Sequence, residues 1–280
     1  MLSDLRNSAD YPLRQWFRWQ RPGLKFRNEP KSDLYDHLPQ PARQFAQETA
    51  ARLLDEYRLS DLYHASTAEN YRENLFYLEM LEQALHTASP TLPPAIAAAD
   101  IGPSSWFYVH ALHAALKWWQ CSAGREVALT GCEADAFRVY LDFHSRFDHA
   151  RAHLRGLTGA RYLPRRFEPL PATFDLITLL FPFVFLKEHL AWGLPARLFS
   201  PVQLLADAWH SLKPGGLLVI VNQGEAEHRA QRDLLQSAAI HPLAAYRHES
   251  TLFQYDLPRW VLVVVKDDEP RVFAAKSGRR

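Results

Sequence analysis

From residue 95 to 267 the chain alternates short apolar runs with segments of helical spacing, and this alternation restricts the fold more than any other feature. The runs are AIAAADIG, EVALTGCE, GARYLPRRF, FDLITLLF, GLLVIVNQ and RWVLVVVKD. Their near-continuous apolar content is typical of strands that are buried on both faces of a parallel sheet. Strands alternating with helices predict an α/β domain with helices on both faces of the sheet.

The last part of this region departs from the alternation. The stretch HESTLFQYDLPRWVLVVV, at 248–265, holds two strand-like runs joined by a turn around Asp256 to Pro258, with no helix between them. Strands joined so closely pair antiparallel. The sequence therefore predicts an α/β fold with a doubly wound, mostly parallel seven-stranded sheet that ends in a C-terminal antiparallel hairpin.

The first ninety residues have a different pattern, helical and without strand alternation. Amphipathic helices are predicted at about 41–58 and 66–85, and Ser66 stands three residues before Glu69, which is the spacing of a capping box. The proline-rich SPTLPP at 89–94 follows them. We expect an N-terminal helical extension at 1–90, the α/β domain at 91–267 and a flexible polar tail at 268–280.

Composition narrows the functional classes. Hydrophobic residues make up 48% of the chain and charged residues 22%, which is ample for a packed core, and the net charge of +1 creates no field that would attract nucleic acid or an anionic membrane. The two cysteines, Cys121 and Cys132, form no CxxC pair, so a reducing compartment is expected. The longest apolar run, at 176–186, is too short to span a bilayer. We expect a cytoplasmic protein without a membrane partner.

Two strand ends carry the residues that suggest a ligand. The first run ends in Asp100 and Gly102, and the helix after it offers free N–H groups to an anionic ligand group. Glu133 ends the second run, where a carboxylate can accept hydrogen bonds from two vicinal ribose hydroxyls. Separately, Asp100 is as easily a helix cap and Glu133 a solvated acid. Together, their positions favour a nucleoside-binding site.

These motifs resemble those of class I S-adenosylmethionine-dependent methyltransferases over about residues 90–267. The resemblance extends to FDLITLLF and above all to LLADAWHSLKPGGLLVIVNQ. The resemblance implies a Rossmann-like fold, S-adenosyl-L-methionine as cofactor, and methyl transfer to an unidentified acceptor, most simply a small molecule. It also implies a role in cofactor binding for several residues: Asp100 and Gly102 at the methionine part, Glu133 at the ribose, Ala134 beside the adenine, and Glu168 at the adenine amino group.

The glycine motif departs from the family pattern. Where the family usually reads D-x-G-x-G-x-G, this chain has Asp100, Gly102, Ser104 and Trp106. Ser104 is small enough to let a ligand approach and remains a cofactor-binding candidate, while Trp106 opens a helix where it can pack inward on the sheet. Two alternatives stay open: a catalytically silent member of the fold that acts as a binding or scaffold protein, and a nicotinamide-dependent oxidoreductase. The missing glycines, the LKPGG turn and the terminal hairpin weigh against the second.

Candidates for the acceptor side follow the fourth and fifth predicted strands. His189 is the candidate general base, because imidazole titrates near neutral pH, although a surface histidine without a role is the alternative. Phe183 either stacks on a planar acceptor or packs in the core. The stretch NQGEAEH concentrates hydrogen-bonding groups at a strand end. The substrate-binding candidates are Phe183, Trp192, Asn222, Gln223 and Glu225.

Two further patterns concern a metal ion and nucleic acid. The pairs His149/His153 and His110/His113 have the spacing of metal ligands on one helix face, but no third ligand is visible, so no metal site is predicted. The segment at 14–27, RQWFRWQRPGLKFR, interleaves basic with aromatic residues, as nucleic-acid platforms do. We expect it to dock on the core, one alternative being a lid over the cofactor cleft. It keeps a nucleic-acid methyltransferase open as an alternative function.

Overall fold

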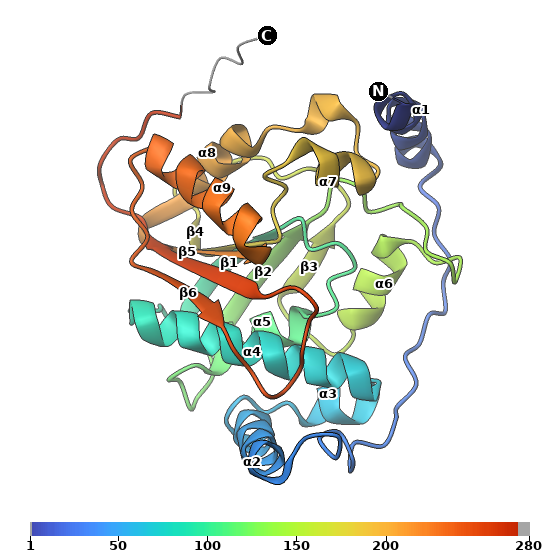
Figure 1. Cartoon of the computed structure of the whole chain (residues 1–280), viewed down its shortest axis with the longest axis vertical. Helices are drawn as coiled ribbons and strands as arrows, with labels where there is room; N and C mark the ends of the chain where they lie inside the picture. The colour runs from blue at the N-terminus through green and yellow to red at the C-terminus, as the bar shows by residue number, and fades with distance from the viewer. Residues whose placement is uncertain (1, 274–280) are drawn as a thin grey trace.

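The computed structural model describes residues 2–273, and this part of the chain forms one mixed sheet flanked by helices (Figure 1). The strand order is β3-β2-β1-β4-β5-β7-β6. Strands β1 to β5 pair in parallel, and β7 is antiparallel to both of its neighbours, β5 and β6. The fold class predicted from the sequence is confirmed. The strands are β1 (Ala95–Ile101), β2 (Glu126–Cys132), β3 (Ala160–Leu163), β4 (Phe174–Leu180), β5 (Leu212–Gln223), β6 (Ala244–His248) and β7 (Arg259–Val265).

Two hydrophobic layers lie on opposite faces of the sheet because successive side chains of a strand point to opposite sides. In β5, Val219 and Val221 belong to the layer that includes α4 (Ala68–Ala88) and α5 (Val109–Trp118), together with Ala150 of α6 (Arg146–His153). Leu218 and Ile220 belong to the other layer, which α8 (Pro201–Ser211) and α9 (Gly224–Ser237) cover. Burial on both faces explains why the strands read as continuous apolar runs.

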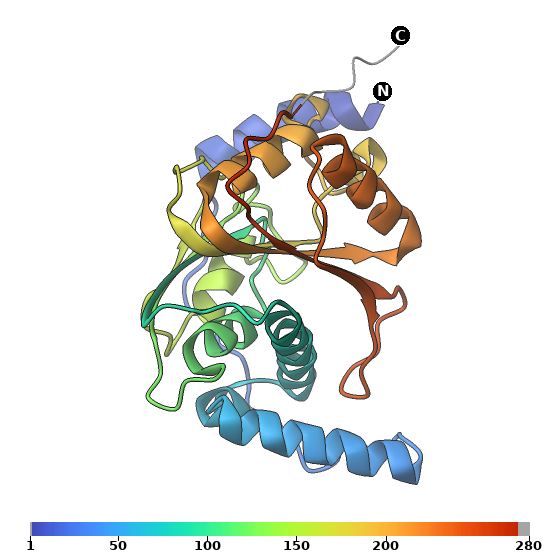
Figure 2. The same ribbon diagram turned by 90° about the vertical axis from the view of Figure 1, so that its left-hand side faces the viewer.

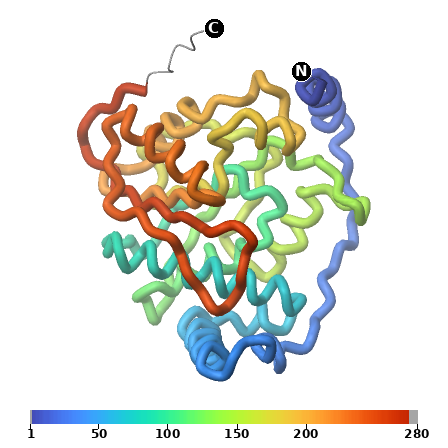
Figure 3. The backbone as a smooth tube through the Cα atoms, in the orientation of Figure 1, coloured from blue at the N-terminus to red at the C-terminus, as the bar shows by residue number. Residues whose placement is uncertain are grey.

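The N-terminal helices lie at two ends of the molecule (Figures 1 and 2). Helix α1 (Leu2–Phe17) contacts α7 (Leu186–Ala191), whereas α2 (Gln40–Glu56) and α3 (Ser60–Ala65) lie by α4 at the opposite end. Residues 18–39 run down one side of the molecule between them (Figure 3). Since α4 shares the core of the sheet, residues 1–90 pack with the α/β region at two separate places. The division at residue 90 remains a prediction.

Some local details differ from the sequence-based expectations. Strand β6 precedes the predicted run, and residues 249–258 form a long loop to β7. Thr67, not Ser66, caps α4 by accepting a hydrogen bond from the Asn70 N–H (3.1 Å), because Ser66 turns back to donate to the Leu62 carbonyl (2.6 Å). Of the expected tail, residues 274–280 lie outside the described residues. Within residues 2–273, no helix is long and apolar enough to cross a membrane.

Candidate functional site

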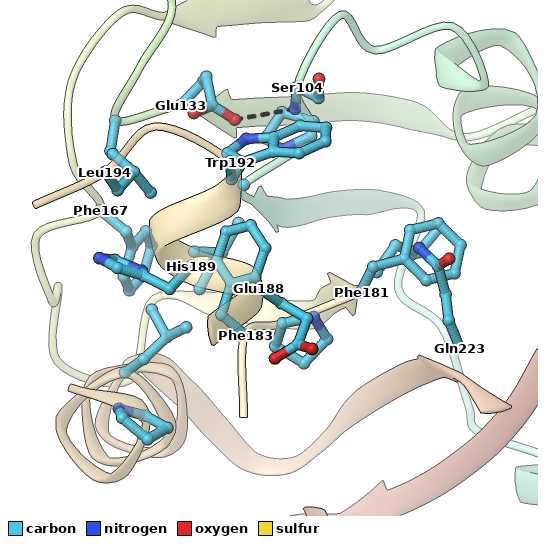
Figure 4. Close-up of a pocket in the computed structure, with 18 of the residues that line it drawn as sticks. Ser104, Glu133, Phe167, Phe181, Phe183, Glu188, His189, Trp192, Leu194 and Gln223 are labelled. Atoms are coloured by element: carbon cyan, nitrogen blue, oxygen red, sulfur yellow. Dashed lines mark hydrogen bonds between the residues drawn. The ribbon is translucent and has the colours of Figure 1, made fainter. Parts of the chain in front are cut away.

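A cavity of about 820 Å³ opens at the carboxyl ends of β1, β2, β4 and β5 (Figure 4). The chain leaves β1 toward β2 on one side, while β4 pairs with β1 on the other, so the cavity lies where the strand order reverses. This is the place at which open α/β sheets bind ligands. Of the predicted site residues, the cavity wall includes Gly102, Ser104, Glu133, Ala134, Phe183, His189, Trp192 and Gln223.

The loop after β1 leaves room for a ligand beside its backbone. Gly102 has a φ of +78°, and a side chain built there would meet no atom within 4 Å. The Gly102 N–H donates to the Cys132 carbonyl (2.9 Å), which fixes the turn against the end of β2. The Ser104 N–H donates to Oε2 of Glu133 (2.9 Å), as Figure 4 shows. The β1 loop and the end of β2 therefore form one wall of the cavity.

Asp100 points away from this wall and is completely buried. Its Oδ2 accepts a hydrogen bond from the Trp106 indole N–H and its Oδ1 from the Thr178 hydroxyl, each at 2.7 Å. Burial raises the pKa of this carboxyl to about 6, against the lowering effect of these hydrogen bonds. The Trp106 ring lies against Gly131, where an added Cβ would come within 2.8 Å of it. Trp106 thus packs inward, and Asp100 holds it instead of lining the cavity.

Glu133 is buried at the mouth of β2, and each carboxylate oxygen already accepts one hydrogen bond. Oε1 accepts from the Asp135 N–H (2.8 Å), and the Arg146 guanidinium lies 3.8 Å away. A carboxylate oxygen has two acceptor positions, so each oxygen of Glu133 keeps one for a ligand. The Arg146 guanidinium also lies over the Trp192 ring, 4.2 Å from its centroid.

Helix α1 binds the backbone of the cavity wall at Ala134. Tyr11 and Gln15 both donate to the Ala134 carbonyl, at 3.1 and 3.0 Å. Arg14 binds both carboxylate oxygens of buried Asp135 and also the Gly193 carbonyl (2.8 Å). The helix therefore connects the end of β2 to the residues that follow α7. Arg14 belongs to the basic segment at 14–27, but no sequence pattern predicts its contacts with Asp135 and Gly193.

His189, Phe183 and Trp192 meet in the cavity wall (Figure 4). The Phe183 ring lies 5.5 Å from His189 and 5.9 Å from Trp192, between ring centroids. His189 is buried, and its Nε2 lies 3.0 Å from the Pro195 carbonyl, which requires the proton on Nε2. Burial lowers the pKa of His189, so the ring is neutral near pH 7 and only Nδ1 can accept a proton.

Besides Asp100, three predicted residues lie outside the cavity. Glu168 is exposed and its carboxylate lies 3.4 Å from Arg165, and Glu225 is exposed and lies 3.8 Å from Arg229. Asn222 is completely buried, and among the described residues its side-chain amide has no hydrogen-bond partner. The side chains of successive residues at the end of β5 point to opposite faces, so Gln223 reaches the cavity and Asn222 does not.

Charged and phenolic residues that were not predicted as site residues also line the cavity. Glu188 follows β4 and Glu227 follows β5, so their positions after strand ends could have identified them as cavity residues. Glu73 and Tyr77 come from α4, in the expected N-terminal extension, while Tyr255 and Arg259 come from the β6–β7 loop and the start of β7. No local pattern brings these last four together.

The histidine pairs have other contacts. His149 lies 2.9 Å from an Asp142 carboxylate oxygen, and the His153 ring stacks on Phe26 with 4.2 Å between centroids. His113 bonds the Thr158 carbonyl at 2.9 Å. In the described residues no group of three His, Cys, Asp or Glu side chains could hold a metal ion.

The segment at 14–27 docks only in part. Arg14 is bound to Asp135 and Phe26 to His153, whereas Trp16 and Phe17 are exposed.

No protein-family model and no curated protein matches the chain, but many solved structures share its fold. A putative class I S-adenosylmethionine-dependent methyltransferase from Listeria monocytogenes superposes with a TM-score of 0.50 at 13% identity, over 80% of this chain and 69% of that one. The chain has the class I methyltransferase fold. A methyltransferase of the same cofactor dependence from Aquifex aeolicus is similar at a TM-score of 0.45 and 16% identity, over 78% of this chain and 97% of that one.

The cavity and the turn after β1 lie at the point of the sheet where the strand order reverses. The antiparallel β7 between β5 and β6 differs from the 3-2-1-4-5-6 order of the dinucleotide-binding Rossmann sheet. This strand order speaks against the nicotinamide-dependent alternative.

Proposed function

We propose that the chain is an S-adenosylmethionine-dependent methyltransferase that acts on a small-molecule acceptor and holds its cofactor in the cavity. The observation that carries the proposal is Glu133 at the end of β2, buried and facing the cavity with one free acceptor position on each oxygen. A pair of vicinal hydroxyls matches these two positions. The fold supports the same reading but, by itself, does not fix an activity.

The residues present fit the proposed cofactor. The open space beside Gly102 admits a ligand next to the backbone, and Ala134 lies in the wall at the end of β2. In the proposal, Glu133 binds the ribose, Gly102 and Ser104 line the methionine side, and Ala134 lies next to the adenine. Asp100 contributes by holding the turn through Trp106, and Glu168 has no part because it lies outside the cavity.

When bound, the cofactor supplies a methyl group on a positively charged sulfur, so the chain needs chiefly to orient two ligands and exclude water. Phe183 and Trp192 contribute apolar rings to the cavity wall. If the acceptor must lose a proton, His189 can take it only through Nδ1, since Nε2 is bound to Pro195.

Calorimetric titration with S-adenosylmethionine and S-adenosylhomocysteine tests the proposal. We expect a Kd in the micromolar range, which corresponds to about 8 kcal/mol of binding free energy. Glu133→Gln should weaken binding at least tenfold, because one carboxylate oxygen is replaced by a donor. Glu168→Gln, an acid outside the cavity, should leave it unchanged.

A second variant guards against misfolding of the loop. Ala134→Leu keeps the hydrogen bonds of Glu133 and adds bulk to the wall, so it should also weaken binding. Absence of binding by the wild-type protein at millimolar ligand would contradict the methyltransferase proposal.

A catalytically silent scaffold is the second candidate, and Asp100 is the observation that favours it. Asp100 is completely buried, binds Trp106 and Thr178, and does not line the cavity. Failure to bind either form of the cofactor, in a protein with a normal unfolding transition, would favour this alternative.

A further inference from the structure

One end of the cavity, which we call the acceptor lobe, lies between α4, the end of β4, α7, α9 and the β6–β7 loop. Its walls are aromatic. The Tyr77 ring lies 5.5 Å from Phe107, 6.3 Å from Phe181 and 6.1 Å from Tyr255, measured between centroids. At these spacings the rings pack edge to face against one another and form one continuous aromatic wall, and the faces of aromatic rings attract positive charge.

Acidic side chains outnumber basic ones in this lobe. Glu73, Glu188 and Glu227 line it, against a single guanidinium, that of Arg259. None of the three carboxylates has a Lys or Arg nitrogen within 4.0 Å among the described residues. Arg259 packs against the aromatic wall of the lobe: its guanidinium lies over the Tyr255 ring at 3.9 Å and the Phe181 ring at 4.8 Å, and it donates to the Leu257 carbonyl.

Two of the three carboxylates have protein donors. Glu73 accepts a hydrogen bond from the Tyr255 hydroxyl (3.0 Å), and Glu227 accepts one from the Gln223 N–H (2.8 Å). Glu188 differs, because its Oε2 is buried and has no hydrogen-bond partner in the described part of the chain. Figure 4 shows its carboxylate directed into the cavity near Phe183 and Phe181. A buried acceptor left without a donor is costly, so a donor from a ligand is the natural partner.

Glu188 and Glu227 line the same cavity, and their charges interact. Burial raises the pKa of Glu227, and the negative charge of Glu188 raises it further, while Arg259 acts in the opposite direction. Carboxylates that disfavour each other's charge are stabilised by a positively charged group. The charge excess, the unpartnered Glu188 oxygen and the ring faces all favour the same kind of ligand.

We propose that the acceptor lobe binds a small aromatic amine, with the protonated nitrogen against Glu188 and Glu227 and the ring against Phe183. This inference rests on the proposed function insofar as the amine is the methyl acceptor. As a binding site it stands on the lobe's own residues.

A comparison of three phenylalkyl probes tests the ligand class: phenethylamine, 3-phenylpropan-1-ol and 3-phenylpropionate. Each is titrated calorimetrically into the full chain, with and without saturating S-adenosylhomocysteine. We expect the amine to bind at least tenfold more tightly than the alcohol, and the carboxylate to bind weakest. Equal binding of amine and alcohol, or a preference for the carboxylate, would overturn the proposal.

Glu188→Gln isolates the residue that carries the inference. It should reduce the preference for the amine over the alcohol at least tenfold and leave the Kd of S-adenosylhomocysteine unchanged. Glu225→Gln, which removes an acid at the start of α9 outside the cavity, is the matched control and should change neither quantity. If the two variants behave alike, Glu188 does not recognise the amine and the proposal is wrong.

The two proposals fail in different ways. Binding of S-adenosylhomocysteine without amine preference would overturn the ligand class and leave the methyltransferase proposal standing. Amine preference without S-adenosylhomocysteine binding would support the lobe as an amine site and overturn the methyltransferase proposal.

Discussion

Trp106 explains how this chain forms the turn after β1 without the second and third glycines of the family motif. Its indole fills the space over Gly131 and donates a hydrogen bond to Asp100, which is completely buried and also accepts a hydrogen bond from Thr178. The bulky residue therefore acts below the turn, while Gly102 keeps the backbone open above it. The altered motif changes the support of the loop and leaves the cavity in place.

Trp106→Phe tests this role. The variant keeps most of the ring but removes the donor to Asp100, so we expect the free energy of unfolding to fall by about 1–3 kcal/mol. Chemical denaturation followed by circular dichroism measures it. A variant as stable as the wild type would show that the hydrogen bond does not support the loop.

Single residues were predictable where the decisive feature is local in sequence. Gly102 and Glu133 follow predicted strands, and strand ends of a parallel sheet meet at one edge, so both were predicted to be at the site and line the cavity. Asp100 was expected to face the ligand, but Thr178 and Trp106 bind it instead. Thr178 lies 78 residues away, and no local pattern identifies such a partner.

At the scale of elements, α1 is attached by polar contacts. Asn7 is its one buried residue within the described chain, and it donates to the carbonyls of Leu190 (2.8 Å) and Leu194 (3.0 Å). Arg14 supplies the ion pair to Asp135. Leu5, in contrast, is 65% exposed and Trp16 75% exposed, so apolar burial contributes little to the docking of this helix.

Arg14→Ala should therefore loosen α1 without unfolding the sheet. Asp135 keeps Arg146 at 3.8 Å, so the cost should be about 2 kcal/mol, below that of stripping a buried carboxylate of every partner. Amide hydrogen exchange in residues 2–17 should accelerate, and exchange in β1 and β4 should not change. Arg6→Ala, which removes only an exposed pair with Asp10, serves as the control. Unchanged exchange in α1 would contradict the role of Arg14.

The existence of helices was predictable more readily than their placement. The spacing of apolar residues predicted α2 and α4, and continuous apolar runs predicted the strands. Both patterns lie within a single element. The positions of α1 and α2 at two ends of the molecule depend on contacts such as Arg14 with Asp135 and Arg52 with Glu82. These pairs are 121 and 30 residues apart, and spacing rules do not reach so far.

For the whole molecule, buried histidines predict a loss of stability in acid. Burial lowers the pKa of His110 to about 4 and that of His153 to about 3, and the charge of His110 further lowers the pKa of His153. Between these values and the unfolded pKa of about 6.5, the unfolded chain binds more protons, so stability falls as pH falls through this range. Asp100, with a pKa raised to about 6, acts in the opposite direction.

The free energy of unfolding, measured by denaturation at pH 7 and pH 5, should fall by about 2 kcal/mol for each of the two histidines, less the opposing effect of Asp100. His153→Phe should make this pH dependence shallower. His64→Gln, a change at an exposed histidine, should not alter it. A slope that is the same in His153→Phe and the wild type would contradict the prediction.

The architecture of the whole molecule followed from the sequence because the alternation of strands and helices admits few sheet arrangements. The acceptor lobe did not follow, since Glu73 of α4 and Tyr255 of the β6–β7 loop meet only after the sheet has formed. These two residues are 182 positions apart.

The docking of α1 also sets an order in time. Asn7 leaves the ribosome early, but its acceptor on Leu194 is 187 residues further along the chain. At about 5–20 residues per second, the ribosome needs on the order of ten to forty seconds to supply that acceptor. During that interval the first helix can reach Ala134 and Asp135 but not the carbonyls that bind Asn7. The first helix to be synthesised is thus among the last to complete its contacts, because these depend on residues that follow α7.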